Sequence, residues 1–385
     1  MNKRERNNLT SKSISILRFP LTIGVVFIHF SLSKGLNIHG TFYGINNPDW
    51  FFFVTNFISE VLARLCVPSF FFISGFLFFN RDNFNKKIYF QKLNTRMRSL
   101  FIPFILWNII AAAFILCKST IPLVSNYYPP IDINFSFVRL LNTFLCNSNN
   151  SGILVYPSDF PPPMDFCPIN IPLWYVRELM IMVLLSPLVY WIIKKEGRYA
   201  IIIIGFIWYT TPFLLPESSY FPMFIQALFF FSWGAFYNIS KIDFIHQFRK
   251  GKWLFFTLYP IIAITDTLTK EFTYSICIHT SGLLFGVPFV FTLTSYLIEN
   301  WEIRPRQIFI DSCFFIYAFH SLFMNDAAKF AFKTLHIPEN VPFIMLVFYL
   351  SVPIITIGLC ISIYVILRSI SPPFCKILTG IRMSN

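Results

Sequence analysis

The stretch ISILRFPLTIGVVFIHF, residues 14–30, has the length and apolar composition of a membrane-spanning helix, yet it contains Arg18 and His29. A charged side chain at the bilayer centre costs roughly 2.5–3.5 kcal/mol on insertion scales. Three helical turns take about 10.8 residues, so these two residues share one helix face, with a rise of about 16 Å between them. This register predicts a first helix that lines a polar path. The alternative is that Arg18 extends to the nearby interface while His29 bonds to a neighbouring helix.

The composition of the whole chain indicates a multi-pass membrane protein. Of its 385 residues, 55% are hydrophobic and 13% are charged, whereas a soluble protein carries about 25% charged residues. We predict an all-α fold of about ten transmembrane helices, forming a single domain over residues 1–385. The expected spans lie near 14–32, 56–79, 99–117, 171–193, 200–215, 221–239, 253–268, 276–298, 309–332 and 341–367.

The distribution of basic residues predicts the orientation in the membrane. With the N-terminus inside, 22 of the 31 Lys and Arg residues fall in cytoplasmic segments, six fall outside and three lie within spans. This bias places both termini in the cytoplasm and the protein in the cytoplasmic (inner) membrane. The same grouping into alternate loops argues against nucleic acid as the partner of a chain with a net charge of +13. No small-residue cleavage site follows the first apolar stretch, so we expect a retained span.

One long loop, at about 118–170, is extracytoplasmic in this topology. It contains NSNNSGILVYPSDFPPPMDFCPIN, which is too polar to cross a membrane, and long loops of this kind are often lids or binding surfaces. Cys146 and Cys167 are the two cysteines placed outside, and the sequence leaves open whether they form a disulfide or remain thiols. The other six cysteines show no metal-ligand spacing, so we expect no metal site.

Five segments, in order along the chain, resemble the membrane acyltransferase-3 family. They are the Arg-x10-His pattern of the first helix, PSFFFISGFLFF (68–79), RSLFIPFILWN (98–108), PLWYVRELMIMVLLSPLVYW (172–191) and SCFFIYAFH (312–320). The resemblance implies an integral membrane O-acyltransferase that moves an acyl group, such as acetyl, onto extracytoplasmic glycans. It also implies that Arg18 and His29 are the important positions of the first helix. There is no Gly-x-Ser-x-Gly, Walker or dinucleotide motif that would favour another chemistry.

The sequence departs from the family where Arg-x-x-Arg is often found at the start of the third helix. Here the segment is KLNTRMR, with Thr95 at the first arginine position. Arg96 and Arg98 point about 200° apart on a helix, while Lys92 and Arg96 are four residues apart and could replace the missing pair. We therefore expect Arg18, Lys92, Arg96 and Arg98 to bind the phosphates of a cytoplasmic acyl-CoA, which is a co-substrate and not a resident cofactor. The alternative for each basic residue is simple orientation of the helix in the membrane.

Several residues are expected at the outer depth, where a glycan or glycolipid acceptor would arrive beside the membrane lipid. Glu60 and Arg64 have the spacing of an ion pair, and Trp174 and Arg177 enter from the outer side of the fourth span. His320 reaches the outer half of the ninth span, whose inner end we expect Asp311 and Ser312 to cap. The alternative for Glu60 and Arg64 is mutual neutralisation, and for His320 a structural role in the core.

These residues suggest a reaction in which His29 removes the proton of the acceptor hydroxyl. Histidine, with an unperturbed pKa near ~6.5, is the side chain best suited to that role. The competing hypothesis is a transporter or flippase for a glycan precursor or acyl donor, in which Arg18, His29 and Glu60 line a route without covalent chemistry. Against it, the sequence shows no inverted repeat and no matching pair of interrupted helices. We expect no appended hydrolase-like domain.

Overall fold

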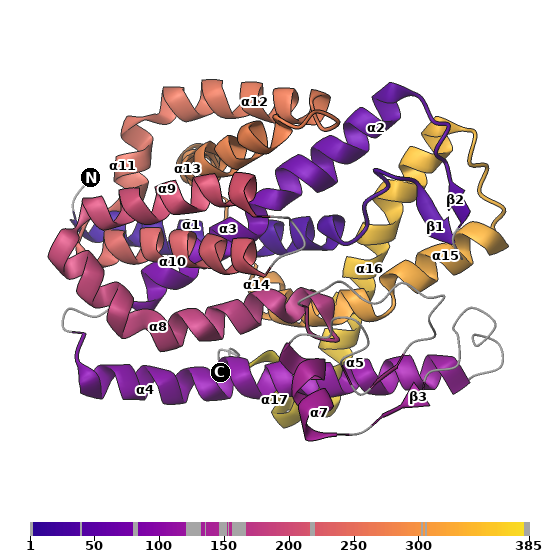
Figure 1. The fold of residues 1–385 in the computed structure, drawn as a ribbon, viewed down its shortest axis with the longest axis horizontal. Helices are drawn as coiled ribbons and strands as arrows, with labels where there is room; N and C mark the ends of the chain where they lie inside the picture. Colours follow the sequence, from indigo (N-terminus) through magenta and orange to yellow (C-terminus); the bar gives the residue numbers. More distant parts are fainter. Residues whose placement is uncertain are drawn as a thin grey trace.

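The computed structural model describes residues 3–38, 41–79, 84–120, 132–134, 136–145, 152, 154–155, 167–215, 220–301, 303–304 and 306–380. These residues form a helical bundle with two small antiparallel sheets of two strands each (Figure 1). The first half contains α1 (Lys3–Ile28), β1 (Leu36–Ile38), β2 (Thr41–Tyr43), α2 (Asp49–Asn56), η1 (Phe57–Leu62), η2 (Ala63–Leu65), α3 (Cys66–Phe78), α4 (Lys86–Arg96), η3 (Met97–Phe101), α5 (Ile102–Thr120), β3 (Asp132–Ile133), α7 (Phe137–Leu145), β4 (Leu154–Val155) and η4 (Ile171–Leu173).

From residue 174 onward, the elements of regular structure in the described residues are all helices. They are α8 (Trp174–Glu196), α9 (Arg198–Leu214), α10 (Phe221–Ile239), α11 (Phe244–Lys250), α12 (Lys252–Leu268), α13 (Ser275–Trp301), α14 (Gln307–Phe319), η5 (His320–Leu322), α15 (Met324–Thr334), α16 (Pro342–Ile370) and α17 (Pro372–Thr379). Every one of the ten expected apolar segments contains a helix, which confirms the all-α class.

Six helical segments of the described chain are long and apolar enough to cross a bilayer. They are Asn8–Ile28, Asp49–Phe78, Lys86–Lys118, Ile171–Glu196, Ser275–Trp301 and Pro342–Ile370. A seventh span arises if Gln307–Leu322 and Met324–Thr334, which are bent by 54°, are taken together. The expected spans at α9, α10 and α12, with 17, 19 and 17 residues, do not meet the same test. The protein is therefore a polytopic membrane protein, and the number ten remains a prediction.

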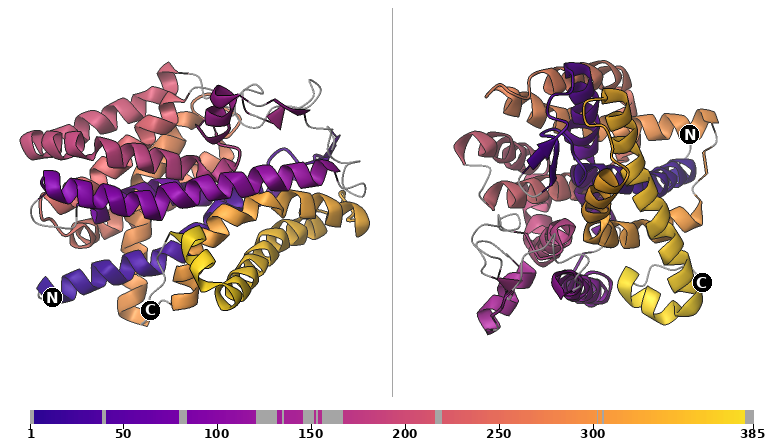
Figure 2. Two further views of the ribbon diagram at one scale, coloured as in Figure 1. Left: turned by 90° about the horizontal axis from the view of Figure 1, so that it is seen from below. Right: turned by 90° about the vertical axis from the view of Figure 1, so that its right-hand side faces the viewer.

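The helix α1 lies at the centre of the bundle, where it contacts α3, α13, α14 and α16. In Figures 1 and 2, α4 and α5 run end to end as one long rod along one side of the molecule. The π-helical turn η3 joins these two helices, and a second π-helical turn, η1, lies between α2 and α3. Such π-helical turns interrupt helices most often at functional sites.

The closest helix packing joins α3 to α10, and two glycines make it possible. A Cβ atom added to Gly75 would collide with the carbonyl oxygen of Phe231, and one added to Gly234 would collide with that of Phe72. In membranes, small residues let helix backbones approach closely and gain van der Waals contact. Around this crossing, the Phe72 ring packs against five aromatic side chains, with centroid distances of 5.2–5.9 Å: Trp233, Tyr237, Phe244, Phe248 and Phe291.

The start of α14 differs from the sequence-based expectation. The helix begins at Gln307 with Arg306 as its N-cap residue, so Asp311 and Ser312 lie inside the helix and do not cap it. Asp311 accepts a hydrogen bond of 2.6 Å from Gln307 and pairs with Arg368 at 3.3 Å. The expectation of a cap at Asp311 and Ser312 was wrong, because the helix begins one turn earlier, at Gln307.

The expected external loop contains regular structure in its described parts. The helix α7 bonds back to the bundle through the Ile169 amide, which donates to the Thr143 carbonyl over 3.0 Å. Cys167 is buried. Cys146 lies outside the described residues, so the question of a disulfide between Cys146 and Cys167 also falls outside them.

Candidate active site

Two cavities lie inside the bundle, and α1 lines both of them. The first, here called the Arg18 cavity, has a volume of about 210 Å³ and is lined by Arg18 and Thr22 of α1 together with Arg96. The second, the His29 cavity, has a volume of about 780 Å³ and is lined by His29 and by Trp174. One helix therefore presents an arginine to one cavity and a histidine to the other.

The two cavities meet at a pair of tyrosines. Tyr175 of α8 and Tyr317 of α14 line both the Arg18 cavity and the His29 cavity. Ser74 holds the Tyr175 hydroxyl at 3.0 Å, and the Tyr317 hydroxyl donates to the carbonyl of Pro172. The two cavities share these tyrosines, and hydrogen bonds hold both phenol groups in place there.

Arg18 lies inside α1, and His29 lies in the turn directly after its last residue, Ile28. The helix is continuous through Pro20, and the Thr22 hydroxyl donates to the Arg18 carbonyl over 2.8 Å. His29 lies in the turn that closes the helix, where its amide donates to the Val26 carbonyl over 3.2 Å. Eleven residues at 1.5 Å each give about 16 Å between the two positions along the axis.

The structure brings His29 and His320 together. Their ring centroids are 5.2 Å apart, with a tilt of 49° between the rings. His320 is fully buried, and its Nδ1 lies 2.9 Å from the Ile316 carbonyl oxygen. Because a carbonyl oxygen can only accept, Nδ1 carries the proton and Nε2 keeps its lone pair. Within the described part of the chain, that Nε2 is buried without a hydrogen-bond partner. Two imidazoles from distant parts of the sequence thus form one candidate acid–base pair.

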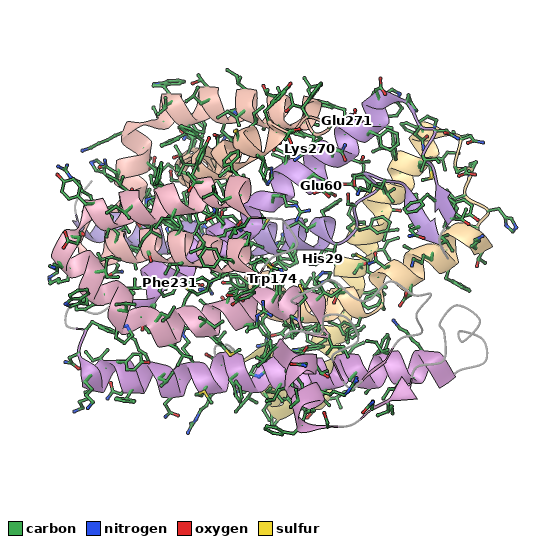
Figure 3. The ribbon with its side chains drawn as sticks, viewed as in Figure 1. His29, Glu60, Trp174, Phe231, Lys270 and Glu271 are labelled. Carbon is green, nitrogen blue, oxygen red and sulfur yellow. The ribbon has the colours of Figure 1, made fainter. Side chains whose placement is uncertain are left out.

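Glu60 and Arg64 form the ion pair that their spacing predicts. The Arg64 Nη2 atom lies 2.6 Å from Glu60 Oε2, and both residues line the His29 cavity. Glu60 lies in the π-helical turn η1, and Lys270 donates to its carbonyl oxygen over 3.3 Å. Figure 3 shows Lys270, Glu60, His29 and Trp174 following one another from the upper part of the view to its middle.

A second group of charged side chains beside the His29 cavity, formed by Asp266, Lys270 and His279, was not predicted from the sequence. Asp266 is buried, and its Oδ2 atom accepts a hydrogen bond of 2.8 Å from His279 Nδ1. Lys270 Nζ lies 3.1 Å from the other carboxylate oxygen, and both Lys270 and His279 line the cavity. The signal available in the sequence was weak: a charged i,i+4 pair at the end of one apolar segment and a histidine at the start of the next.

The four basic residues expected to bind phosphates are not equivalent in the structure. Arg18 and Arg96 line the same cavity. Lys92, by contrast, donates to the Phe78 carbonyl and lies 4.9 Å above the Phe78 ring. Arg98 is exposed and, among the described residues, is not one that lines the Arg18 cavity.

Arg177 lies away from the His29 cavity. Its Nε donates to Glu178 over 2.9 Å, and the Tyr220 hydroxyl donates to the same carboxylate over 2.7 Å. Arg177 lines a third, mostly apolar cavity of about 610 Å³, which it shares with Arg96. Trp174, one turn earlier, lines the His29 cavity.

Apolar helices around two neighbouring cavities, each lined in part by charged side chains, define a multi-pass membrane protein with an internal site for chemistry or passage. Residues 11–365 match the model of the acyltransferase-3 family, described as an acyltransferase domain, and the chain belongs to this family. It is also similar to the succinoglycan biosynthesis protein ExoH of Rhizobium meliloti (strain 1021), with 26% identity over 204 residues. That match covers 50% of this chain and 45% of the relative, so the chain matches less than half the length of that protein. No solved structure matches the fold.

Proposed function

We propose that this protein is an O-acyltransferase that transfers an acyl group, such as acetyl, from cytoplasmic acyl-CoA to a hydroxyl of an extracytoplasmic polysaccharide or glycolipid. The observation that carries the proposal is the meeting of the two cavities at Tyr175 and Tyr317, with arginines in one and a histidine in the other. Family membership supports the acyl transfer, and the name of the similar protein from Rhizobium meliloti supports a polysaccharide acceptor.

The donor would bind with its phosphates near Arg18 and Arg96. Both guanidinium groups belong to the Arg18 cavity, and arginine binds phosphate oxygens through two parallel hydrogen bonds. Lys92 and Arg98 would add a longer-range attraction, which falls with salt. From there the thioester arm would extend past the two tyrosines toward His29, along the roughly 16 Å that separate Arg18 from His29 on α1.

The acceptor would bind in the His29 cavity, where Trp174 offers a flat apolar surface and Glu60 with Arg64 offers polar groups. His29 would remove the proton of the attacking hydroxyl as its oxygen bonds to the acyl carbon. The carbon–sulfur bond would then break, and the same proton would pass to the departing thiolate of coenzyme A. The reaction therefore balances without a metal or another cofactor. His320, 5.2 Å away between ring centroids, would support His29.

This mechanism requires a defined orientation of the protein. We propose ten spans in the cytoplasmic membrane, with both termini in the cytoplasm, so that the Arg18 cavity opens toward cytoplasmic acyl-CoA. The bias of basic residues toward alternate loops supports this orientation.

The test is deletion of the gene in the source organism, with analysis of its cell-surface polysaccharide by NMR. We expect an O-acyl ester to disappear on deletion and to return on complementation. Purified protein should transfer label from acyl-CoA to the unacylated polysaccharide. If the polysaccharide is unchanged by deletion and the purified protein moves glycan across vesicles without consuming thioester, the chain is a flippase instead.

A further inference from the structure

The His29 cavity contains a group of side chains that the proposed reaction does not use. Asp266 lies in the last turn of α12, Lys270 follows in the connecting turn, and His279 lies in the first turns of α13. Lys270 and His279 line the cavity with side chains that are 27% and 28% exposed, whereas the Asp266 side chain is 2% exposed. The carboxylate is thus behind the cavity wall, and the ammonium and the imidazole form part of that wall.

The contact with Asp266 fixes which nitrogen of the His279 ring carries the proton when the ring is neutral. A carboxylate accepts hydrogen bonds, so the 2.8 Å contact requires that His279 Nδ1 carries a proton. In the neutral ring, Nε2 then has a lone pair and can only accept. The buried carboxylate orients the ring in the way that carboxylates orient catalytic and metal-binding histidines.

Lys270 supplies a hydrogen-bond donor beside this acceptor. Its Nζ atom lies 3.5 Å from His279 Nδ1, 3.3 Å from the Glu60 carbonyl oxygen and 3.1 Å from Asp266 Oδ1. An ammonium group has three N–H donors, and the Glu60 carbonyl oxygen accepts one of them. The contact with Asp266 Oδ1 is an ion pair, so Lys270 keeps N–H groups for a ligand. Lys270 and the His279 ring, one with N–H donors and the other with a lone pair at Nε2, are therefore neighbours, and both residues line the cavity that also contains His29.

A hydroxyl group both donates and accepts a hydrogen bond, so it matches this pair. The cations of the cavity wall already have carboxylate partners, since Arg64 is paired with Glu60 and Lys270 with Asp266. Because these charges cancel, the wall favours uncharged hydroxyl groups. An anionic group would lose its hydration on entering the cavity and would find no unpaired cation to compensate for that loss.

We propose that Lys270 and His279 form a subsite that binds a second hydroxyl of the acceptor sugar, with Asp266 as the positioning residue for His279. This inference rests on the proposed function and adds to it the side chains that orient the acceptor sugar. The hydroxyl at the subsite orients the sugar, and this orientation selects which other hydroxyl reaches His29 and is acylated.

Two substitutions of the same residue separate this role from a purely structural one. His279→Asn keeps a donor at the position of Nδ1, and hence the bond to Asp266, but removes the Nε2 acceptor. His279→Gln keeps a polar group at the position of Nε2 but loses the bond to Asp266. The matched control is His246→Asn, the same change at an exposed histidine of α11.

The experiment uses purified full-length protein, labelled acetyl-CoA and the unacylated polysaccharide from the deletion strain, with ester positions assigned by NMR. We expect His279→Asn to melt like the wild type and to bind acetyl-CoA normally. Its KM for the polysaccharide should rise about 3- to 10-fold, the loss of one hydrogen bond, and the ester should spread to neighbouring hydroxyls. Lys270→Gln, which keeps an N–H donor, should raise this KM about 3-fold.

Other results would overturn the inference. If His279→Asn has the wild-type KM and ester position while His279→Gln melts earlier, the Asp266–His279 bond only joins α12 to α13. If Lys270→Gln raises the acceptor KM 100-fold or more, the subsite binds an anionic group by charge and not a hydroxyl. If the wild-type protein itself acylates no polysaccharide, the proposed function fails, and the subsite fails with it.

Discussion

The role of His29 can be tested by replacing it with glutamine. Glutamine keeps a polar nitrogen at the position of Nε2 but cannot accept a proton at neutral pH. If His29 is the general base, His29→Gln should lower the transfer rate by roughly 10²–10⁴-fold, the usual contribution of a positioned acid–base group. Acyl-CoA binding should be almost unchanged, because Arg18 lies about 16 Å away along α1.

A double variant tests whether His29 and His320 act together in the transfer reaction. His29 and His320 have ring centroids 5.2 Å apart, and residues that act as a unit show strongly non-additive losses. His29→Gln combined with His320→Gln should therefore lose little more than His29→Gln alone. In the wild type, transfer should fall as the pH is lowered, because a protonated imidazole cannot remove a proton.

The assay measures transfer of labelled acetyl and binding of acetyl-CoA on the same preparation, with thermal melting as the test of folding. His246→Gln, on exposed α11 surface, is the control. Near-normal transfer by well-folded His29→Gln would refute the reasoning. The base would then be sought at His320, whose Nε2 is buried and lacks a partner among the described residues.

Three further predictions concern donor binding, orientation and packing. Arg18→Ala should weaken acetyl-CoA binding roughly 10- to 100-fold, as expected for the loss of a charge-assisted hydrogen bond. Arg98→Ala should have a small effect that disappears at high salt. Binding titrations at two salt concentrations compare the two variants, and equal effects would count against the Arg18 cavity as the donor site. A cysteine in place of Lys250 should resist an impermeant thiol reagent in intact cells and one in place of Asn134 should react, whereas the opposite pattern would invert the topology. Gly234→Ala should lower stability by about 1–3 kcal/mol, because its methyl group overlaps the backbone of α3; an unchanged melting temperature would show that α3 and α10 can separate at no cost.

The sequence by itself determined the class of the protein and the register of its first helix. Apolar segments of membrane-spanning length must be helical, since a helix satisfies its own backbone hydrogen bonds in lipid. The fixed helical period likewise predicts that Arg18 and His29 share one face. The i,i+4 pair of Glu60 and Arg64 follows from the same local geometry. These features depend on residues that are close in the chain.

Only the tertiary structure decided which distant residues meet. The contact of His29 with His320 depends on how α14 packs against α1, and the bond between Asp266 and His279 depends on the turn that joins α12 to α13. The same holds for Arg96, which reaches the Arg18 cavity, and for Arg177, which pairs with Glu178 away from the His29 cavity. Helix spacing specifies the faces of one helix, whereas the packing of side chains from several helices determines which faces enclose a common cavity.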